Sequence, residues 1–475
     1  MSLVSQIAKN TSYQVFGKVV GAAIGLVVVG MMTRYLGQEG FGNYTTVVAF
    51  LQFFGVLADF GLQMTVTKMI SRPGADEKKI IANAFTLRFF SAAAVLGLAV
   101  AVGWFFPYVN VIKRGLVIAS ASFFFISLQS VLISFFQKRM DSKKIALAEI
   151  VGRLMLLVGV YLAIVYQEGL LYILLAVALG SLANFFILFI SAESHIAFRF
   201  DFDFKIWRQI WSATWPLALT IALTLVYFRA DTLIMSIFRP QSEVGLYGAA
   251  YKVVEVLVQF PYLFLGFVLP LLANFFIADK KMFSAILQKS FDFLFILAAP
   301  MVLGTLVVGE KIMAFIAGQD FIVSGDILKI LILAVATIYL GALFGYAVVA
   351  GDLQKKMIRF YVFDALISLV LYLIFIPLYS YWAAATITVL SELIMAFSAF
   401  YVLKKYTGVG VKFNLATKAT ISAALMAAAI YLISLVQSHN VFTLILVGII
   451  IYFGALYLMR GINKEMMREI VGYKS

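Results

Sequence analysis

The sequence contains no cysteine and only two histidines, His195 and His439, which stand alone. It therefore offers no disulfide framework, no thiolate nucleophile and no cluster with the ligand spacing of a metal site. The phosphate-binding pattern GxxxxGK followed by Ser or Thr is also absent, which excludes an ATPase motor of that class within the chain. We expect neither an enzyme nor a bound cofactor, because the sequence shows no constellation of catalytic residues.

Charged residues are also scarce, at 13% of the chain, whereas 63% of the residues are hydrophobic and the mean hydropathy is +1.01. A soluble domain is nearer half apolar. The apolar residues form runs of about 20, the length that a helix needs to cross roughly 30 Å of hydrocarbon. The sequence therefore predicts an all-α polytopic membrane protein with about 14 transmembrane helices. They lie near residues 11–36, 43–67, 82–107, 115–136, 147–166, 170–192, 213–237, 247–272, 291–309, 327–350, 360–377, 383–403, 418–436 and 442–460.

The net charge of +14 is concentrated on one side of these spans. With the N-terminus in the cytoplasm, about 26 of the 37 lysines and arginines fall in cytoplasmic segments, as the positive-inside rule requires. Gln137–Lys144 and Asp352–Arg359 are the clearest of these segments. The even number of spans returns the C-terminus to the cytoplasm. Membrane topology thus explains the charge, and no nucleic-acid partner is expected.

One stretch of sequence occurs twice. Gln38–Tyr44 reads QEGFGNY and Gln241–Tyr247 reads QSEVGLY, so Gln, Gly and Tyr recur at the same offsets. The repetition predicts two six-helix lobes with a seam between them, related by a pseudo-twofold axis along the membrane normal. The predicted parts are an N-terminal lobe at 1–192, a cytoplasmic amphipathic linker at 193–212, a C-terminal lobe at 213–403, and two additional helices with a cytoplasmic tail at 404–475.

Two connections carry further local signals. Gly37, Gly40 and Gly42 are expected in a tight turn between the first two spans, where glycine relieves backbone strain. Within the linker, His195–Phe204 alternates aromatic and polar residues, a period of two that predicts an extended strip on the membrane surface. Three tryptophans that follow at helical spacing predict an interfacial anchor.

Charged residues inside the predicted spans are the candidates for function, because an unpaired charge in hydrocarbon is costly. Several have a simpler interpretation. Glu149 and Arg153 are four residues apart, which favours a structural pair on one helix. Asp364 lies near a span end, where we expect it to be solvated. Glu392 is central in its span, where we expect a buried hydrogen bond.

The remaining charges point to one central cavity. Arg229 and Asp231 lie two apart in the seventh span, so each needs a partner on another helix or in water. If the first, second, seventh and eighth spans meet at the pseudo-twofold axis, the cavity would be slightly basic. It would hold the cations Lys18, Arg34, Arg229 and Lys252 and the carboxylates Asp59, Asp231 and Glu255. Such a set, at low dielectric, would bind an anionic head group.

Four of the charged residues inside the spans have an alternative. Lys18 lies within two turns of the predicted inner surface, as does Arg88, and either side chain could extend to that surface instead. Lys252 and Glu255 are three residues apart and could pair with each other.

The motifs RYLGQEGFGNY, LADFGL, FRADTLI and EVGLYGAAYKV resemble the polysaccharide-export branch of the multidrug/oligosaccharidyl-lipid/polysaccharide transporter superfamily, the Wzx-type oligosaccharide flippases. The resemblance covers nearly the whole chain. It implies a multi-pass protein of the bacterial or archaeal cytoplasmic membrane that moves an undecaprenyl-(pyro)phosphate-linked oligosaccharide across it by alternating access. The sugar would pass through the central cavity while the prenyl tail stays in lipid.

The resemblance also implies roles for the charged candidates. Cations would bind the phosphate: Lys18, Arg34, Arg229 and Lys252, with Arg88 in second place. The carboxylates to test for coupling to H⁺ or Na⁺ are Asp59, Asp231 and Glu255. The implied partners are membrane lipids and the undecaprenyl-linked glycan, with a glycan polymerase as a further candidate. Two alternatives of the same superfamily are a MATE-type cation/drug antiporter, which would favour an acidic cavity, and a lipid II flippase.

Overall fold

The computed structural model describes residues 3–59, 61–193, 200–436 and 440–461, and their side chains from residue 10 onward apart from 11, 58, 215–229, 277 and 436. The described part consists of α-helices and one short 3₁₀ turn, η1 (Gln319–Phe321), without a strand. The helices are α1 (Leu3–Asp59), α2 (Leu62–Ile70), α3 (Glu77–Phe105), α4 (Asn110–Lys138), α5 (Ser142–Val165), α6 (Leu170–Glu193), α7 (Phe204–Phe238), α8 (Gln241–Ala278), α9 (Lys280–Ala317), α10 (Val323–Ala350), α11 (Gln354–Thr407), α12 (Asn414–Val436) and α13 (Val441–Leu458).

Eleven of the described helices are long and apolar enough to cross a membrane. Two of them, α1 and α11, each contain two predicted spans joined at one non-helical residue, Gly37 (φ 65°) in α1 and Ser380 (φ 54°) in α11. The seventh predicted span coincides with α7. The 14 predicted spans therefore all fall on helical segments, and the all-α polytopic fold class is confirmed.

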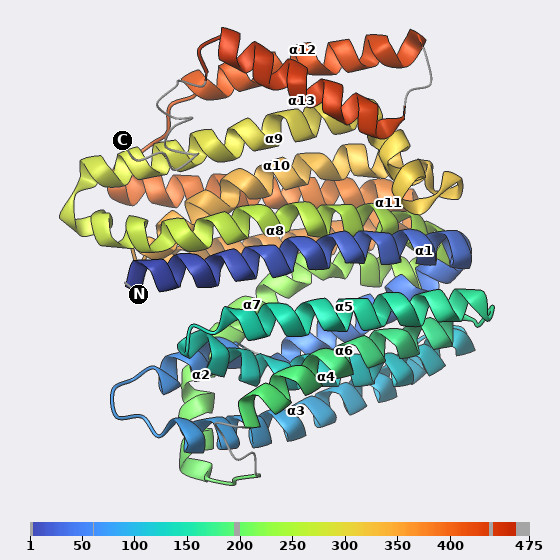
Figure 1. The fold of residues 1–475 in the computed structure, drawn as a ribbon, viewed down its shortest axis with the longest axis vertical. Helices are drawn as coiled ribbons and strands as arrows, with labels where there is room; N and C mark the ends of the chain where they lie inside the picture. Colours follow the sequence, from blue (N-terminus) through green and yellow to red (C-terminus); the bar gives the residue numbers. More distant parts are fainter. Residues whose placement is uncertain (1–2, 60, 194–199, 437–439, 462–475) are drawn as a thin grey trace. The chain divides into compact units, whose positions relative to one another are not determined.

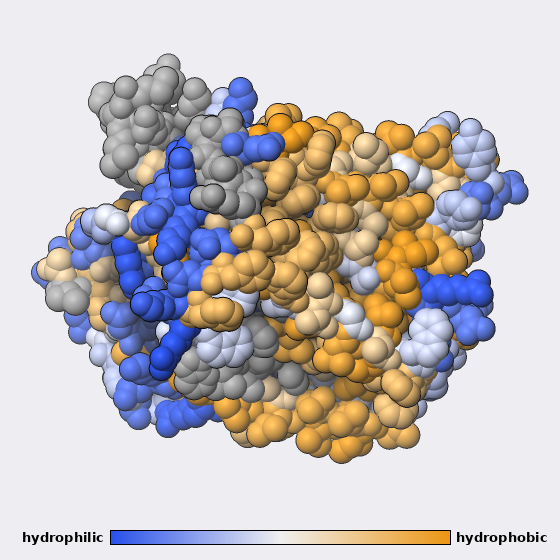
Figure 2. Space-filling view, turned by 90° about the horizontal axis from the view of Figure 1, so that it is seen from below, coloured by the Kyte–Doolittle hydropathy of each residue, from blue (hydrophilic) through white to orange (hydrophobic). Residues whose placement is uncertain are grey.

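The surface supports the same conclusion. Large apolar side chains are exposed on many helices, with Phe105 at 91% and Leu458 at 82%. Hydrophobic residues cover most of the face shown in Figure 2, and hydrophilic residues gather at its two opposite edges. A soluble protein rarely exposes such an area, so these side chains face lipid.

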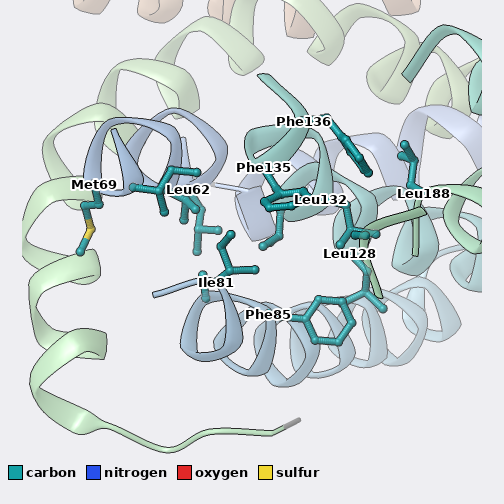
Figure 3. Packing of buried hydrophobic residues seen from close by; sticks show 14 of the residues in the cluster. Leu62, Met69, Ile81, Phe85, Leu128, Leu132, Phe135, Phe136 and Leu188 are labelled. Carbon is teal, nitrogen blue, oxygen red and sulfur yellow. The ribbon is translucent and has the colours of Figure 1, made fainter. Parts of the chain in front are cut away.

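The chain divides into two compact units, Met1–Gly248 with Leu369–Ala384, and Ala249–Ser368 with Ala385–Ser475. In the first unit, α4 packs against α6 and α3, while α5 packs against α6 and α1 (Figure 1). Buried apolar side chains of α2, α3, α4 and α6 form one core, with Leu62, Ile81 and Leu132 among the residues drawn in Figure 3.

The second unit has a separate core. The pair α12 and α13 packs against α9, and α9 packs against α10 (Figure 1). Met426, Leu444 and Tyr452 are buried in this core, where the Tyr452 hydroxyl donates a hydrogen bond of 2.7 Å to the carbonyl of Ile296. The two additional C-terminal helices are therefore integral to this unit.

The second predicted span is broken near its end. α1 stops at Asp59, Gly61 adopts a left-handed conformation (φ 80°), and α2 starts at Leu62. Glycine enters this region of φ and ψ without the steric cost that other residues meet. The sequence predicted one continuous helix over 43–67, so the break is a departure from that prediction.

The described part of the linker binds to α3. The Asn83 side chain donates to Asp201 Oδ2 (2.8 Å) and accepts from the backbone N–H of Asp203 (2.7 Å). Lys79 lies 2.6 Å from Asp203, and its hydrogen bond lowers the pKa of that carboxyl. Phe200 stays half-exposed beside α3, whereas His195 lies outside the described residues. The predicted surface strip is therefore fixed to a helix by its polar side chains.

Candidate functional site

The two copies of the repeated stretch pack directly against each other. A Cβ atom on Gly42 would lie 1.7 Å from the carbonyl oxygen of Gln241, and one on Gly245 would lie 2.0 Å from that of Gln38. The contact is reciprocal, since each glycine faces the glutamine of the other copy. The Thr46 hydroxyl adds a 2.6 Å hydrogen bond to Gln241 Oε1. The repeated residues therefore form a seam between the two copies within the first unit, whereas the two predicted six-helix lobes stay a prediction.

The three glycines at the first copy, Gly37, Gly40 and Gly42, have different roles. Gly37 alone makes the turn, with φ 65° and ψ −174°, and the next helix starts immediately. Gly40 and Gly42 are helical, so their predicted place in the turn is wrong. The helix extends over them because one residue with positive φ suffices to reverse the chain direction. Gly42 is needed instead for the close approach to Gln241.

The break in the second span places Asp59 beside Arg88 of α3. Arg88 Nη2 lies 2.6 Å from Asp59 Oδ1, and Arg88 Nε donates to the carbonyl of Ser127 at 3.1 Å. The Arg88 side chain is only 2% exposed, whereas that of Asp59 is 32% exposed. Arg88 therefore does not extend to the membrane surface. Its charge is neutralised within the protein, and removing Asp59 would leave a costly buried charge on Arg88.

Asp231 is buried and held by hydrogen-bond donors. Its Oδ2 accepts from the Tyr247 hydroxyl at 2.5 Å, and its Oδ1 accepts from the backbone N–H and the hydroxyl of Thr232. Tyr247 is the tyrosine of the second motif copy and is itself fully buried. The contact joins α7 to α8 within the first unit, so Asp231 positions the seam. Asp231 thus finds the partner on another helix that its position predicted, whereas the side chain of Arg229 lies outside the described ones.

Lys252 and Glu255 pair on one face of α8, as their spacing indicated. Lys252 Nζ lies 2.8 Å from Glu255 Oε2, and both side chains are about one-quarter exposed, at 23% and 26%. Lys252 and Glu255 belong to the second unit, whereas the other candidates belong to the first. One cavity that collects all seven charges therefore stays a prediction.

Lys18 and Arg34 of α1 are the most exposed of the candidate cations whose side chains the structure describes. Lys18 Nζ lies 3.8 Å from Glu149 Oε1 of α5, and its side chain is 46% exposed. Arg34 is exposed, and its Nη1 donates to the carbonyl of Gly30 at 2.9 Å. The predicted pairing of Glu149 with Arg153 is wrong, because the helix packing brings Lys18 to Glu149 instead.

A polar cluster that the sequence analysis missed surrounds the bend of α11. Arg239 binds Glu243 through two hydrogen bonds, of 2.7 and 2.9 Å, and donates a third to the carbonyl of Pro377 at 3.2 Å. The Ser380 hydroxyl, at the bend itself, bonds to Glu243 Oε2. This hydrogen bonding raises the pKa of Arg239. The spacing of four between Arg239 and Glu243 was a usable signal.

Two carboxylates of α11 differ from their predicted settings. Asp364 is fully buried and accepts hydrogen bonds from Ser391 Oγ (2.7 Å) and Ser368 Oγ (3.4 Å), so its predicted solvation is wrong. The reason is that α11 starts at Gln354, about ten residues and roughly 15 Å before Asp364. Glu392 is partly exposed and has no hydrogen-bond partner among the described residues, where a buried hydrogen bond was predicted.

No group of three or more His, Asp or Glu side chains that could hold a metal ion occurs in the part of the chain that the structure describes.

The charged candidates with described side chains fall into three kinds. Asp59 with Arg88, and Lys252 with Glu255, are mutually paired. Asp231 is a buried positioning residue. Lys18 and Arg34 are accessible cations.

Comparison with known proteins identifies relatives over nearly the whole chain. The model of the family described as "Polysaccharide biosynthesis protein" matches residues 7–276. A curated relative, the probable low-salt glycan biosynthesis flippase Agl15 of Haloferax volcanii, is 21% identical, and the match covers 98% of each chain. These matches confirm the resemblance to the polysaccharide-export branch.

Solved structures share the fold. The lipid II flippase MurJ, in an inward closed conformation, superposes with a TM-score of 0.77 over 95% of this chain and 98% of its own, at 16% identity. A multidrug resistance MATE family transporter in an inward-facing conformation gives a TM-score of 0.69 at 11% identity, covering 84% and 98%. A superfamily transporter from Pyrococcus furiosus gives 0.59 at 12% identity, covering 85% and 95%. At these identities the likeness describes the fold.

Proposed function

The chain belongs to the family of polysaccharide biosynthesis proteins, and we propose that it is a flippase that moves an undecaprenyl-(pyro)phosphate-linked oligosaccharide unit across the cytoplasmic membrane by alternating access. The observation that carries the proposal is the family match over residues 7–276, which includes both copies of the repeated motif. Agl15, whose printed description is a probable glycan biosynthesis flippase, supports it.

Lys18 and Arg34 are the phosphate ligands that we propose first. Both are exposed, and the 3.8 Å pair of Lys18 with Glu149 is loose enough for an anionic head group to replace the carboxylate. Lys252 is a second choice, because its ammonium already binds Glu255. Arg88 is set aside as a direct ligand in this conformation, since its guanidinium is occupied by Asp59 and Ser127. Arg229 is kept as a candidate from the sequence.

Coupling to H⁺ or Na⁺ would act through the exposed members of the two ion pairs. Asp59 and Glu255 both expose part of the carboxylate while binding a cation. Neutralising either carboxylate would release its partner and favour another conformation. Asp231 is a weaker candidate, because Tyr247 and Thr232 already satisfy it.

The proposal places the protein in the cytoplasmic membrane of a bacterium or archaeon, with both termini in the cytoplasm. It acts as a transporter without a chemical step, and a glycan polymerase is its proposed partner.

The fold shared with MurJ makes a lipid II flippase the second candidate. Rescue of a strain depleted of its lipid II flippase would favour that candidate, and efflux of a cationic dye would favour a drug antiporter.

Removal of the gene tests the proposal in cells. The expected result is that lipid-linked oligosaccharide accumulates while its exported polysaccharide disappears, and that the wild-type gene restores export. The double variant Lys18→Ala/Arg34→Ala should reach the membrane and restore little export. Normal export in the deletion strain would overturn the proposed function, whereas normal export by the double variant would overturn only the two phosphate ligands.

A further inference from the structure

A group of tyrosines surrounds Glu392 in the second unit, and none of the roles above uses it. The tyrosine–glutamate cluster consists of Tyr262 of α8, Tyr346 of α10, and Tyr361 and Glu392 of α11. All four belong to the same compact unit. Glu392 lies in the middle of a predicted span, so the cluster is at membrane depth.

The members of the cluster lie close together. The ring centroids of Tyr262 and Tyr346 are 6.5 Å apart with the planes tilted by 42°. Glu392 is near enough to Tyr262 and to Tyr361 to interact with both electrostatically. Two aromatic rings and a carboxylate therefore lie near one another, on three helices.

A proline in α8 ties the helix to α10 next to Tyr262. Pro261 has no N–H, so the carbonyl of Leu257, four residues earlier, lacks its helical donor. The Tyr339 hydroxyl of α10 supplies that donor at 3.1 Å. The residue after the proline, Tyr262, is 44% exposed although it lies within a transmembrane helix.

The polar tips of the cluster lack hydrogen-bond partners. No hydrogen bond joins the three tyrosine hydroxyls or the Glu392 carboxylate to a protein atom among the described residues, and all four residues keep part of their surface exposed. Asp364 beside them differs, because Ser391 and Ser368 bind its two carboxylate oxygens. Unpaired polar groups in hydrocarbon cost free energy, so the tips of the cluster need water or a polar ligand.

We propose that the tyrosine–glutamate cluster is a binding subsite for the sugar part of the lipid-linked substrate. Sugars offer apolar C–H faces that fit aromatic rings, and hydroxyl groups that donate to a carboxylate and exchange hydrogen bonds with tyrosine. The cluster provides both at one place. This inference rests on the proposed flippase function and adds a second contact, remote from the cations that would bind the phosphate.

The test compares two lipids that differ only in the sugar. The full-length protein in lipid nanodiscs is titrated with undecaprenyl diphosphate and with undecaprenyl diphosphate N-acetylglucosamine. The wild type should bind the sugar-bearing lipid more tightly. Tyr262→Ala and E392Q should each reduce that preference about fivefold to tenfold, the loss expected for one stacking contact or one hydrogen bond to a charged group. Tyr262→Phe, which keeps the ring, should lose less than Tyr262→Ala.

Tyr431→Ala is the matched control, because Tyr431 is a similarly exposed tyrosine (54%) on α12 of the same unit. It should leave the preference unchanged. A wild-type preference that survives Tyr262→Ala and E392Q within twofold overturns the subsite and leaves the flippase intact. If E392Q weakens the binding of both lipids equally, the carboxylate does not recognise the sugar, and this result also overturns the subsite. A wild type that binds neither lipid contradicts the proposed function itself.

Discussion

The two copies of the repeated motif make the same crossing but differ in what surrounds it. Gly42 and Gly245 each contact the glutamine carbonyl of the other copy. At the position of Gly40 the second copy has Glu243, which binds Arg239 and the Ser380 hydroxyl at the α11 bend. The shared residues therefore build the seam, and Glu243, which differs from Gly40, connects the second copy to α11.

The tyrosines show the same division. Tyr247 is fully buried and donates to Asp231, whereas Tyr44 is partly buried and packs on the ring of Phe41 at 5.6 Å. A repeated sequence thus specifies the backbone approach, while the burial of the two tyrosines differs. Substitutions at equivalent positions of the two copies should therefore agree at the glycines and disagree elsewhere.

The largest effect is expected at the glycines. Gly42→Ala and Gly245→Ala would each place a Cβ within about 2 Å of a helix carbonyl, so the two helices must separate. We expect each to lower the free energy of unfolding by about 3 kcal/mol, as for severe overpacking. Thermal unfolding of the solubilised protein measures this. Gly97→Ala is the control, because a Cβ there meets nothing within 4 Å. Equal melting temperatures for all three variants would contradict the seam.

The next largest effect is expected at Tyr247, the buried tyrosine of the second copy. Tyr247→Phe would remove a 2.5 Å hydrogen bond from buried Asp231, which should cost about 2 kcal/mol. Thermal unfolding of this variant is compared with that of Tyr166→Phe, which alters a residue that is 73% exposed. A Tyr247→Phe variant as stable as Tyr166→Phe would show that the hydroxyl does not position Asp231.

A smaller effect concerns the residues unique to the second copy. Arg239→Gln would remove the bidentate contact to Glu243, which is partly exposed, and the bond to the Pro377 carbonyl. We expect a loss of about 1.5 kcal/mol and faster amide hydrogen exchange near the α11 bend. The double variant with Glu243→Gln should cost little more than either single change. Fully additive losses would mean that the two residues act independently.

The smallest effect is expected at the hydroxyl that joins the copies. Thr46→Val would remove its hydrogen bond to Gln241 at a cost of about 1 kcal/mol. Thr33→Val is the matched control, since the Thr33 hydroxyl bonds to the carbonyl of Val29 in its own helix. Chemical denaturation of both variants measures the difference. A larger loss for Thr33→Val would contradict the proposed contribution of Thr46 to the seam.

The helices were the predictable part of the molecule. Long apolar runs predicted every span, and the recurrence of Gln, Gly and Tyr indicated the residues at which the two copies meet. The break at Asp59–Gly61 was not predicted, because a Gly within an apolar run does not reveal whether the helix continues or stops. The turn was also tighter than expected, since the sequence offers three glycines and Gly37 alone turns the chain.

The partners of the charges were much less predictable. Spacing along one helix correctly suggested the pair of Lys252 with Glu255. It failed for Glu149, which binds Lys18 of another helix, because that contact depends on how α1 and α5 are rotated and packed. Asp59 and Arg88 were both recognised as candidates, yet nothing in the sequence joins them before the second span is known to break.

The most direct measurement follows a lipid-linked sugar across a bilayer. The purified protein is placed in vesicles that carry a fluorescent undecaprenyl diphosphate disaccharide, and a membrane-impermeant reductant reports how much probe lies in the outer leaflet. The proposed function predicts that the protected inner fraction is lost rapidly with wild-type protein and slowly in protein-free vesicles. Vesicles that keep the protected fraction at the protein-free rate, with protein that remains folded, would contradict it.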